Sequence, residues 1–544
     1  MYPTRPRRWL ALSLTVTLAY SIVPLLSAFR GEFVVDSDAR QHVFWMARFL
    51  DPGLFPNDWI ADYHQFVAPW GYTQLYRLAV IAGIEPFTFN KLLPPILAAI
   101  AAFYLFRFCR EIGTSPPTAF LATLLLNQTI WMRYDITTGT ARSFIYPLFA
   151  AFLFYLARRQ ALGVGAAIAL QGLFYPQCVL ISCGTIGLGW LRSTWQSRSL
   201  PDRRTTALAV CGLVAGFCVL LPYALRSSSF DPAIDAATAR QMVEFLPGGR
   251  VEFFHENPIE FFTYGRRSGI VPKMSWTSPL IWAALLPIPL WRTLNIDADR
   301  QKLETLADAE IASIGLFFVA HLTLFRIHHP SRYTMHSLLV VLAVAAAIWI
   351  APRLWQVGTF LRGHIGRNGA IAVLAAFTIV LPAATHQYHF KYRQGKAPEL
   401  YTYLQTQPRD AMTATLSRLG NDVPSHARRS VLASVMFAMP YHVGYYDEIV
   451  RRIDATIAAQ YTDDPQVLAE VVDRYGIDFW LLDREAFDAE YLMQDWLLPF
   501  AEREAAIARS GTPILEQARD RCTVVAGEDW QLIDVSCARA DSDP

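Results

Sequence analysis

Two carboxylates and an imidazole lie close together directly after the first long apolar segment of the chain. Asp36 and Asp38 are separated by one serine, and His42 follows four residues after Asp38. On a helix that begins near Asp38, residues four apart share a face. Because a positioned carboxylate or imidazole can accept a proton, Asp36, Asp38 and His42 are candidate catalytic residues. The alternative is structural: Asp38 caps the next helix, with Gln41 completing a capping box, and His42 is a hydrogen-bonded structural histidine.

A second acidic position follows the third apolar segment. Asp135 ends the run Arg133-Tyr134-Asp135, and Arg142 lies a little further along the chain. Carboxylates brought together from separate loops supply the hard oxygen ligands that Mg²⁺ and Mn²⁺ prefer. Asp36, Asp38 and Asp135 are therefore candidate metal ligands. An ion pair that only holds the loop explains Asp135 as well.

Arginines in the polar runs suit the binding of phosphate. Arg332 and Tyr333 lie between two later apolar segments. A guanidinium has a fixed fork of donors that fits phosphate oxygens, and a neighbouring aromatic ring can form a wall of the site. Arg332, Tyr333 and Arg142 are therefore the candidate phosphate-binding residues.

The segments around these residues are apolar enough to cross a membrane. Hydrophobic residues make up 53% of the 544 residues, and Leu10–Phe29 is one long apolar run. About 20 such residues suffice to cross a bilayer as a helix. The 48 Lys and Arg nearly balance the 46 Asp and Glu, so no basic surplus indicates binding to nucleic acid. The first two-thirds of the chain therefore predict an integral membrane protein.

We predict about eleven transmembrane helices, several of them short. Basic residues cluster in alternate loops, which in membrane proteins face the cytoplasm. Because Arg5, Arg7 and Arg8 precede the first run, we expect a cytoplasmic N-terminus, Asp36 on the outer side of the plasma (inner) membrane, and an extracytoplasmic C-terminus. The predicted spans are Leu10–Phe29, Phe87–Phe106, Thr118–Trp131, Phe144–Ala157, Ala161–Phe174, Cys178–Leu191, Thr206–Leu225, Pro279–Trp291, Ile311–Phe325, Ser337–Ile350 and Ala370–Ala384.

The chain divides into two predicted domains. Residues 1–384 form the transmembrane domain, with outer loops 30–73, 132–143, 226–278 and 326–336. In the loop 226–278, phenylalanines interleaved with acidic residues predict an amphipathic interfacial helix. Residues 385–544 form an extracytoplasmic α/β domain, because strand-like runs alternate with helical ones. The strand-like runs are Ala411–Leu416, Ser430–Ser434 and Asp478–Asp483, and the helical ones are Tyr446–Tyr461 and Pro465–Tyr475.

Two cysteines in the C-terminal domain are spaced for a disulfide. Cys522 and Cys537 bracket two apolar pairs around the turn Gly527-Glu528-Asp529. A hairpin centred on this turn would place the cysteines on opposite strands, where Cα atoms lie about 4.5 to 5.5 Å apart. This spacing is within the range of a disulfide, and disulfides persist in oxidising compartments. We therefore predict a Cys522–Cys537 bond outside the cytoplasm.

Three classes of function remain open at this point. The sequence has no Walker motif and no Gly-x-Ser-x-Gly elbow, so nucleotide-driven transport and serine hydrolysis lack their usual signals. A membrane enzyme, a transporter or flippase of a lipid-linked or polar substrate, and a non-catalytic envelope scaffold are all compatible with the pattern. A transporter would place charges and broken helices in the middle of the membrane, rather than at its outer face.

The first loop resembles that of the GT-C glycosyltransferases, especially oligosaccharyltransferase catalytic subunits. An outer Asp-x-Asp follows the first helix, and Arg332-Tyr333 looks like the outer Arg-Tyr of bacterial members. Further residues that carry the resemblance are Ala39-Arg40-Gln41-His42, Phe55-Pro56-Asn57-Asp58, Ala68-Pro69-Trp70-Gly71 and, in the C-terminal domain, Tyr475–Asp483. The Trp-Trp-Asp motif by which oligosaccharyltransferases bind their acceptor is absent from the sequence.

The resemblance implies a GT-C-like helical membrane domain and an inverting transfer of a sugar. The donor would be a polyprenyl-phosphate-linked sugar held in membrane lipid, and the acceptor a glycan, lipid or protein outside the cytoplasm. Asp36 or Asp38 would be the carboxylate at the active centre, Asp135 its acidic partner from the second loop, and Arg332 a contact to the donor phosphate. Mg²⁺ or Mn²⁺ is the expected cofactor.

Overall fold

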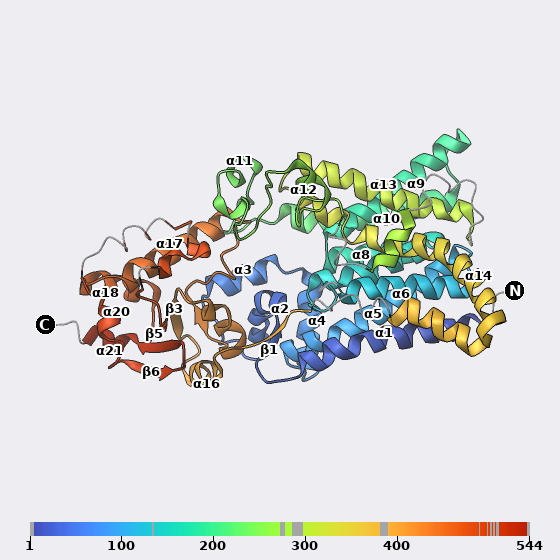
Figure 1. Cartoon of the computed structure of the whole chain (residues 1–544). Coiled ribbons are helices and arrows are strands. Elements are labelled where there is room, and N and C mark those ends of the chain that lie inside the picture. The colour runs from blue at the N-terminus through green and yellow to red at the C-terminus, as the bar shows by residue number, and fades with distance from the viewer. Residues whose placement is uncertain are drawn as a thin grey trace.

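The molecule is elongated, with a helix bundle at one end and a sheet-containing domain at the other (Figure 1). The N-terminus lies at the free end of the bundle, and the C-terminus lies at the far end of the second domain. The computed structural model describes residues 5–132, 135–271, 278–285, 298–380, 390–488, 490–497, 499–500, 503, 506 and 511–540.

Most of the predicted apolar runs form helices of the bundle. Proline at the first helical position and an acidic cap favour several starts; Glu85, for example, caps α5 by accepting from the backbone N–H of Thr88. The helices are α1 (Pro6–Ala28), α5 (Pro86–Glu111), α6 (Pro116–Met132), α7 (Ile145–Ala157), α8 (Ala161–Phe174), α9 (Gln177–Ser197), α10 (Arg203–Leu225), α13 (Arg300–Leu322) and α14 (Ser337–Ala375).

The predicted count of about eleven spans is not confirmed. Among the described residues, five helices are long and apolar enough to cross a bilayer. α14 has a sharp break at Gly366, with φ of +72°, so it joins the predicted span Ser337–Ile350 to the start of the span Ala370–Ala384. The described part of the span Pro279–Trp291 is the 3-10 helix η5 (Pro279–Leu285). Residues 286–291 and 381–384 of these two spans lie outside the described residues.

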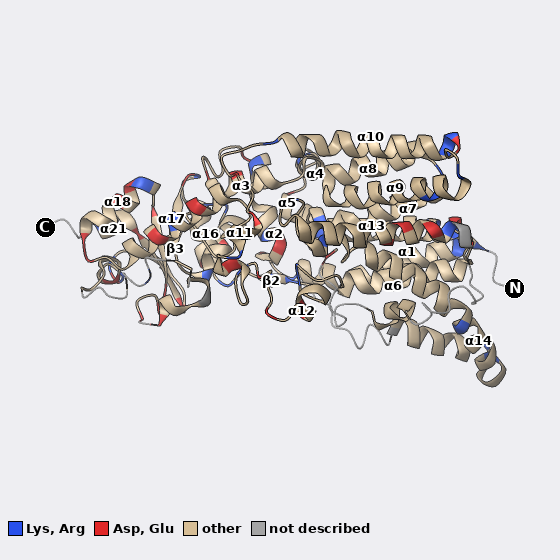
Figure 2. Ribbon diagram, turned by 90° about the horizontal axis from the view of Figure 1, so that it is seen from above, with Lys and Arg blue, Asp and Glu red and all other residues tan. Residues whose placement is uncertain are grey.

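Charged residues gather at the two ends of the bundle and are sparse along the middle of the long helices (Figure 2). At the end near the N-terminus, ion pairs join loops that the sequence predicts to share one side. Arg158 Nε lies 3.9 Å from Glu111 Oε2, Lys302 Nζ lies 3.7 Å from Glu111 Oε1, and Arg159 Nη1 lies 3.9 Å from Asp202 Oδ2. These loops therefore lie at the same end of the bundle, as predicted. The side of the membrane that this end faces stays a prediction.

The C-terminal domain contains the predicted α/β unit. Its sheet has the strand order β4-β3-β5-β7-β6, in which β3 pairs in parallel with β4 and β5, and β7 pairs antiparallel with β5 and β6. The strands are β3 (Met412–Thr415), β4 (Ser430–Val431), β5 (Phe479–Asp483), β6 (Thr523–Ala526) and β7 (Trp530–Asp534), with helices α16 (Pro398–Thr406), α17 (Val443–Gln460) and α18 (Pro465–Tyr475).

Cys522 and Cys537 are joined by a disulfide, with their Cα atoms 5.5 Å apart. The hairpin around Gly527 is present, but Cys537 lies on the short helix α21 (Val535–Ala540) after β7, not on the strand opposite Cys522. The bond therefore joins the start of β6 to the helix that leaves the hairpin.

The first loop lies between the bundle and the C-terminal domain. It contains β1 (Val34–Asp36), α2 (Ser37–His42), the 3-10 helix η1 (Phe44–Phe49), α3 (Trp59–Val67) and α4 (Trp70–Ile81). On one continuous helix from Asp38, Val43, Phe44, Ala47 and Leu50 would share a face toward lipid. In the structure Val43, Phe44 and Ala47 are buried in the protein core, and Leu50 is exposed. The three buried side chains fix the first loop against the rest of the protein.

The loop 226–278 also differs from its prediction. Its described residues, 226–271 and 278, form only short helices, among them η3 (Val243–Phe245) and α12 (Pro258–Thr263), instead of an interfacial amphipathic helix. Phe245 and Phe253 are buried with Phe325 in a small apolar cluster. Phe245 and Phe253 therefore pack against protein rather than against lipid. Residues 272–277 lie outside the described part of the chain, as do residues 133 and 134 of the loop 132–143.

Candidate active site

Asp36 and Asp38 have different positions although only one residue separates them. Asp36 is the N-cap of α2, and its Oδ1 accepts a hydrogen bond of 2.9 Å from the backbone N–H of Asp38. Such a cap stabilises a helix by about 1 kcal/mol. Asp36 is 1% exposed, whereas the side chain of Asp38 is 30% exposed. The cap is therefore Asp36, and the carboxylate of Asp38 is left to face the site.

The C-terminal domain holds α2 in place. β1 pairs antiparallel with β2 (Tyr392–Gln394), the strand that follows the bundle. Arg40 forms a buried ion pair with Asp422, and Ser425 donates a hydrogen bond of 3.1 Å to the carbonyl oxygen of Arg40. Gln41 donates to the carbonyl oxygen of Met436 at 3.1 Å. The position of Asp38 thus depends on contacts more than 380 residues away in sequence.

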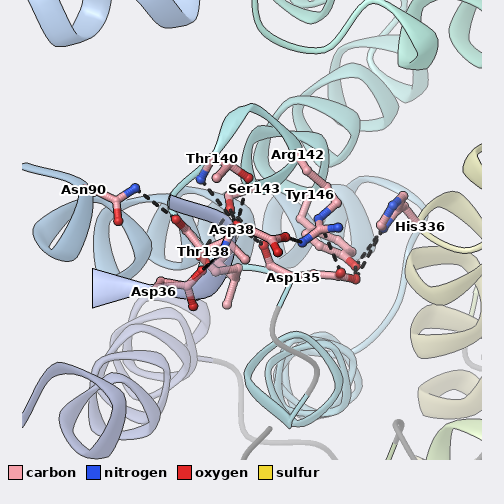
Figure 3. Close-up of polar contacts among 11 residues, drawn as sticks. Asp36, Asp38, Asn90, Asp135, Thr138, Thr140, Arg142, Ser143, Tyr146 and His336 are labelled. Atoms are coloured by element: carbon pink, nitrogen blue, oxygen red, sulfur yellow. Dashed lines mark hydrogen bonds and ion pairs between the residues drawn. The ribbon is translucent and has the colours of Figure 1, made fainter. Parts of the chain in front are cut away.

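Arg142 joins the carboxylates of the first and second loops (Figure 3). Its Nη2 lies 2.7 Å from Asp38 Oδ2, and its Nε lies 3.5 Å from Asp135 Oδ1. Asp135 is 2% exposed, so its charge is compensated inside the protein. The structure therefore brings together three residues that the sequence selected separately.

Two further residues, Tyr146 and His336, which are not among the candidates predicted from the sequence, also contact Asp135. The hydroxyl of Tyr146, on α7, donates a hydrogen bond of 2.9 Å to Asp135 Oδ2. His336, which precedes α14, has its Nδ1 3.5 Å from the same oxygen and 3.1 Å from the Tyr146 hydroxyl. Figure 3 shows the resulting line of contacts from Asp38 through Arg142 and Asp135 to His336. No spacing in the sequence indicated it, because the partners come from three separate helical segments.

The two carboxylates of the first loop titrate in opposite directions. Burial, with the nearby charge of Asp38, raises the pKa of Asp36 to about 7. Burial acts to raise the pKa of Asp38 too, but nearby positive charges, chiefly Arg142 with Lys391 and Arg266, outweigh it and hold that pKa below its usual value. Asp38 is therefore ionised at neutral pH, whereas Asp36 is partly protonated.

His42 lies at the end of α2 and is exposed to solvent. Dense surrounding protein lowers its pKa, and the charges of Arg142 and Arg332 add to this effect while Asp38 opposes it. Its ring also packs edge-on against that of His64, with ring centroids 5.7 Å apart. A neutral imidazole is therefore available beside Asp38 at neutral pH.

The predicted Mg²⁺ or Mn²⁺ does not fit these residues. Among the residues that the structure describes, no group of three His, Cys, Asp or Glu side chains is arranged to hold a metal ion. The guanidinium of Arg142 lies between Asp38 and Asp135, where their common ion would have to lie, and Asp36 Oδ1 is used in capping α2. A positively charged donor in this place competes with a cation for the same oxygens.

The two predicted phosphate-binding residues of the later loop differ in their surroundings. Arg332 lies in the 3-10 helix η7 (Pro330–Tyr333), is half-buried, and is near enough to His42 to affect its pKa. Tyr333 is fully buried, and its hydroxyl donates to the carbonyl oxygen of Ile327. Its position therefore supports packing of the loop, rather than the predicted contact with phosphate.

Comparisons with known proteins identify solved structures with a similar architecture. No protein-family model matches the sequence, and no curated protein sequence matches it. The oligosaccharyltransferase AglB of Archaeoglobus fulgidus, in its apo form, aligns over 92% of this chain and 72% of its own, with 12% identity and a TM-score of 0.58. The same enzyme in complex with an inhibitory peptide and a dolichol-phosphate aligns over the same shares with 12% identity and a TM-score of 0.57.

A second kind of enzyme matches with a similar score. The arabinofuranosyltransferase AftD from Mycobacteria aligns over 98% of this chain and 42% of its own, with 14% identity and a TM-score of 0.53. AglB and AftD are GT-C glycosyltransferases. This chain has their fold, a bundle of membrane helices followed by a sheet-containing domain, and it is a membrane protein.

Proposed function

We propose that this protein is an inverting GT-C glycosyltransferase. It moves a sugar from a polyprenyl-phosphate-linked donor to an acceptor outside the cytoplasm, which is a glycan, a lipid or a protein. The fold supports this proposal, since AglB is an oligosaccharyltransferase whose structure holds a dolichol-phosphate and AftD is an arabinofuranosyltransferase. An isoprenoid tail stays in lipid, which accounts for apolar helices directly beside the site.

The observation that carries the proposal is the meeting of two loops through Arg142. Asp38 follows α1 and Asp135 follows α6, so both lie where a helix of the bundle ends. A transporter or flippase would instead gather its polar groups near the middle of the bundle. Carboxylates at the end of the bundle, beneath a second domain, suit a reaction between a lipid-anchored donor and an acceptor in water.

In this proposal Asp38 is the general base. The acceptor hydroxyl gives its proton to the carboxylate of Asp38 as its oxygen attacks the anomeric carbon of the donor sugar. The bond from that carbon to the donor phosphate breaks on the opposite face, so the configuration inverts. The electron pair of the broken bond stays on the phosphate oxygen, where Arg332 stabilises the charge. Arg142 keeps Asp38 ionised, and the neutral His42 hydrogen-bonds the acceptor.

The proposal also includes an orientation of the protein in the plasma (inner) membrane. The N-terminus and the basic end of the bundle face the cytoplasm, and Asp38 and the C-terminal domain face outward. The Cys522–Cys537 disulfide supports this orientation, because such bonds persist mainly in oxidising compartments.

A donor assay tests the proposal. Purified full-length protein is incubated with a panel of polyprenyl-phosphate sugars, and consumption of the donor is followed. We expect turnover of at least one donor and a loss of about 100-fold or more in Asp38→Asn, because this variant lacks the base. The matched control is Asp62→Asn, since Asp62 lies in the same loop and also pairs with an arginine at 2.7 Å, namely Arg48. Near-normal turnover in a folded Asp38→Asn variant contradicts the assignment.

A further inference from the structure

A cavity of about 740 Å³ lies where the first loop meets the C-terminal domain. Its size is within the range of small-ligand sites, about 300 to 1,000 Å³. It is lined by residues 472–478 around the end of α18, by the start of β3, by single residues of α17 and α21, and by Asn57 of the first loop. None of the residues around Asp38 lines it, and in Figure 1 α18 lies toward the free end of the C-terminal domain whereas α2 lies nearer the bundle. The cavity is therefore separate from the candidate active site.

Turns of the backbone shape the rim of this cavity. α18 ends at Gly476, whose φ of +62° is the left-handed conformation that glycine adopts readily at the C-terminus of a helix. A Cβ atom added at Gly476 would meet no heavy atom within 4 Å, so the chain turns here beside open space. Asn57 has a φ of +51°, which asparagine tolerates better than most residues do. Two regions far apart in the sequence thus turn where they border the cavity.

The charges that line the cavity balance one another. Three arginines and three aspartates line it, namely Arg452, Arg474, Arg539, Asp410, Asp473 and Asp478. Arg539 Nη1 lies 2.6 Å from Asp473 Oδ1, and Arg452 Nε lies 2.9 Å from Oε1 of Glu448 on α17. A cleft lined by one sign of charge attracts ligands of the opposite sign, and this cavity has no such excess. The ligand expected here is therefore neutral overall.

Polar groups of both kinds remain for a ligand. Arg474 and Asp410 are exposed and, within the described part of the chain, form no ion pair. The amide of Asn57 likewise makes no hydrogen bond to the described residues. The guanidinium of Arg474 lies 5.2 Å from the centre of the Tyr475 ring, a cation–π contact that holds it at the wall of the cavity. A carboxylate supplies acceptors, a guanidinium supplies paired donors, and an amide supplies both.

This set of groups suits a neutral ligand with many hydroxyl groups. Because a hydroxyl both donates and accepts, neighbouring hydroxyls of a sugar can bind a carboxylate and a guanidinium at the same time. A lipid tail would take water from these charged groups and offer them no partner. An extended peptide is commonly bound along the free edge of a sheet. Met412 instead lies on β3, which has a strand on each side. An oligosaccharide therefore fits the lining best.

We propose that this cavity binds sugars of a glycan acceptor, away from the hydroxyl that reacts. This inference rests on the proposed glycosyltransferase function, and it selects the glycan among the proposed acceptors. The first loop contributes Asn57 to the cavity and Asp38 to the candidate active site, so one loop connects the two places. A glycan that is held at the cavity and reaches Asp38 has a raised local concentration at the site of reaction, without any new contact there.

A binding assay separates this inference from the proposed function. Purified full-length protein in detergent is applied to an array of neutral oligosaccharides, acidic oligosaccharides and extended peptides, and the affinity of each bound compound is then measured by calorimetry. We expect neutral oligosaccharides to bind more tightly than acidic ones. If a donor is consumed but no glycan binds, the sugar site is wrong and the proposed function stands. If glycans bind but no donor is consumed, the proposed function fails and the cavity stands as a sugar-binding site.

Variants of two exposed residues locate the binding in the cavity. Arg474→Gln and Asp410→Asn should each weaken glycan binding by about tenfold, because each removes a charge-assisted hydrogen bond. Arg451→Gln is the matched control, since this exposed arginine of α17 is the neighbour of Arg452 but does not line the cavity. It should bind glycans as the unmodified protein does. Unchanged affinity in both cavity variants, or binding of peptides in place of glycans, overturns the inference.

Discussion

In one half of the candidate site an arginine pairs with two carboxylates, whereas in the other half arginines donate to backbone carbonyl oxygens. On one side, Asp38, Arg142 and Asp135 compensate one another, and Tyr146 and His336 hold the buried end of that network. On the other side, Arg250 and Arg267 donate to backbone carbonyl oxygens and, within the described part of the chain, form no ion pair with a carboxylate. A compensated network has a fixed geometry before substrate arrives, whereas an uncompensated one gains its missing partner from the substrate. Under the proposed function, the compensated half positions the base, and the other half is the side on which the donor is expected to bind.

The largest effect in this comparison is expected from breaking the compensated half. In Arg142→Gln, Asp38 loses its ion pair and the buried Asp135 loses its neutralising charge, which is costly inside a protein. We expect the rate of transfer to fall by about 100-fold. Because Arg142 lowers the pKa of Asp38, its removal raises that pKa, so the acidic limb of the pH–rate profile should move to higher pH.

Initial rates over a range of pH check this expectation, with Arg142→Lys as the comparison. Lysine keeps the charge but cannot reach both carboxylates with a planar fork, so it should restore the position of the acidic limb better than the rate. If the acidic limb stays unmoved in a folded Arg142→Gln variant, Arg142 does not set the ionisation of Asp38.

A smaller effect, on stability rather than rate, separates Asp36 from Asp38. Burial raises the pKa of Asp36 in the folded protein above its unfolded value, so the folded state binds the extra proton. Asp36 therefore disfavours folding increasingly as the pH rises from its unfolded pKa toward about 7. Asn caps helices as well as Asp does, so Asp36→Asn should be more stable than the unmodified protein at pH 8 and no more stable at pH 4.

Thermal unfolding at these two pH values measures the effect, and the rate of transfer should stay within a few-fold of normal. The matched comparison is Asp38→Asn. Because the pKa of Asp38 is held below its usual value in the folded protein, this variant should be less stable than the unmodified protein at pH 8, the opposite sign to Asp36→Asn, and its rate of transfer should be lost. If Asp36→Asn instead abolishes transfer in a folded protein, the two carboxylates have been assigned to the wrong roles.

The local features of this site follow from the sequence, and its long-range contacts do not. Asp38 and His42 were predictable as a pair, because four residues on one helix bring them together whatever surrounds that helix. The apolar runs and strands are likewise periodic patterns, and most of them formed where predicted. The ion pair of Arg40 with Asp422 and the sharing of the Met436 carbonyl oxygen depend on how two domains dock. No spacing along the chain encodes that docking.

The smallest expected effect concerns the divalent cation that the sequence predicted. With the guanidinium of Arg142 between Asp38 and Asp135, a cation would have to displace a bound positive charge before it could reach either carboxylate. We therefore expect chelation by EDTA to leave the rate of transfer unchanged, and Mn²⁺ titrations followed by electron paramagnetic resonance to show no stoichiometric site. A tightly bound Mn²⁺ whose removal abolishes transfer would mean that both carboxylates leave Arg142 when the donor binds. The compensated half would then be a resting state rather than the geometry that performs the reaction.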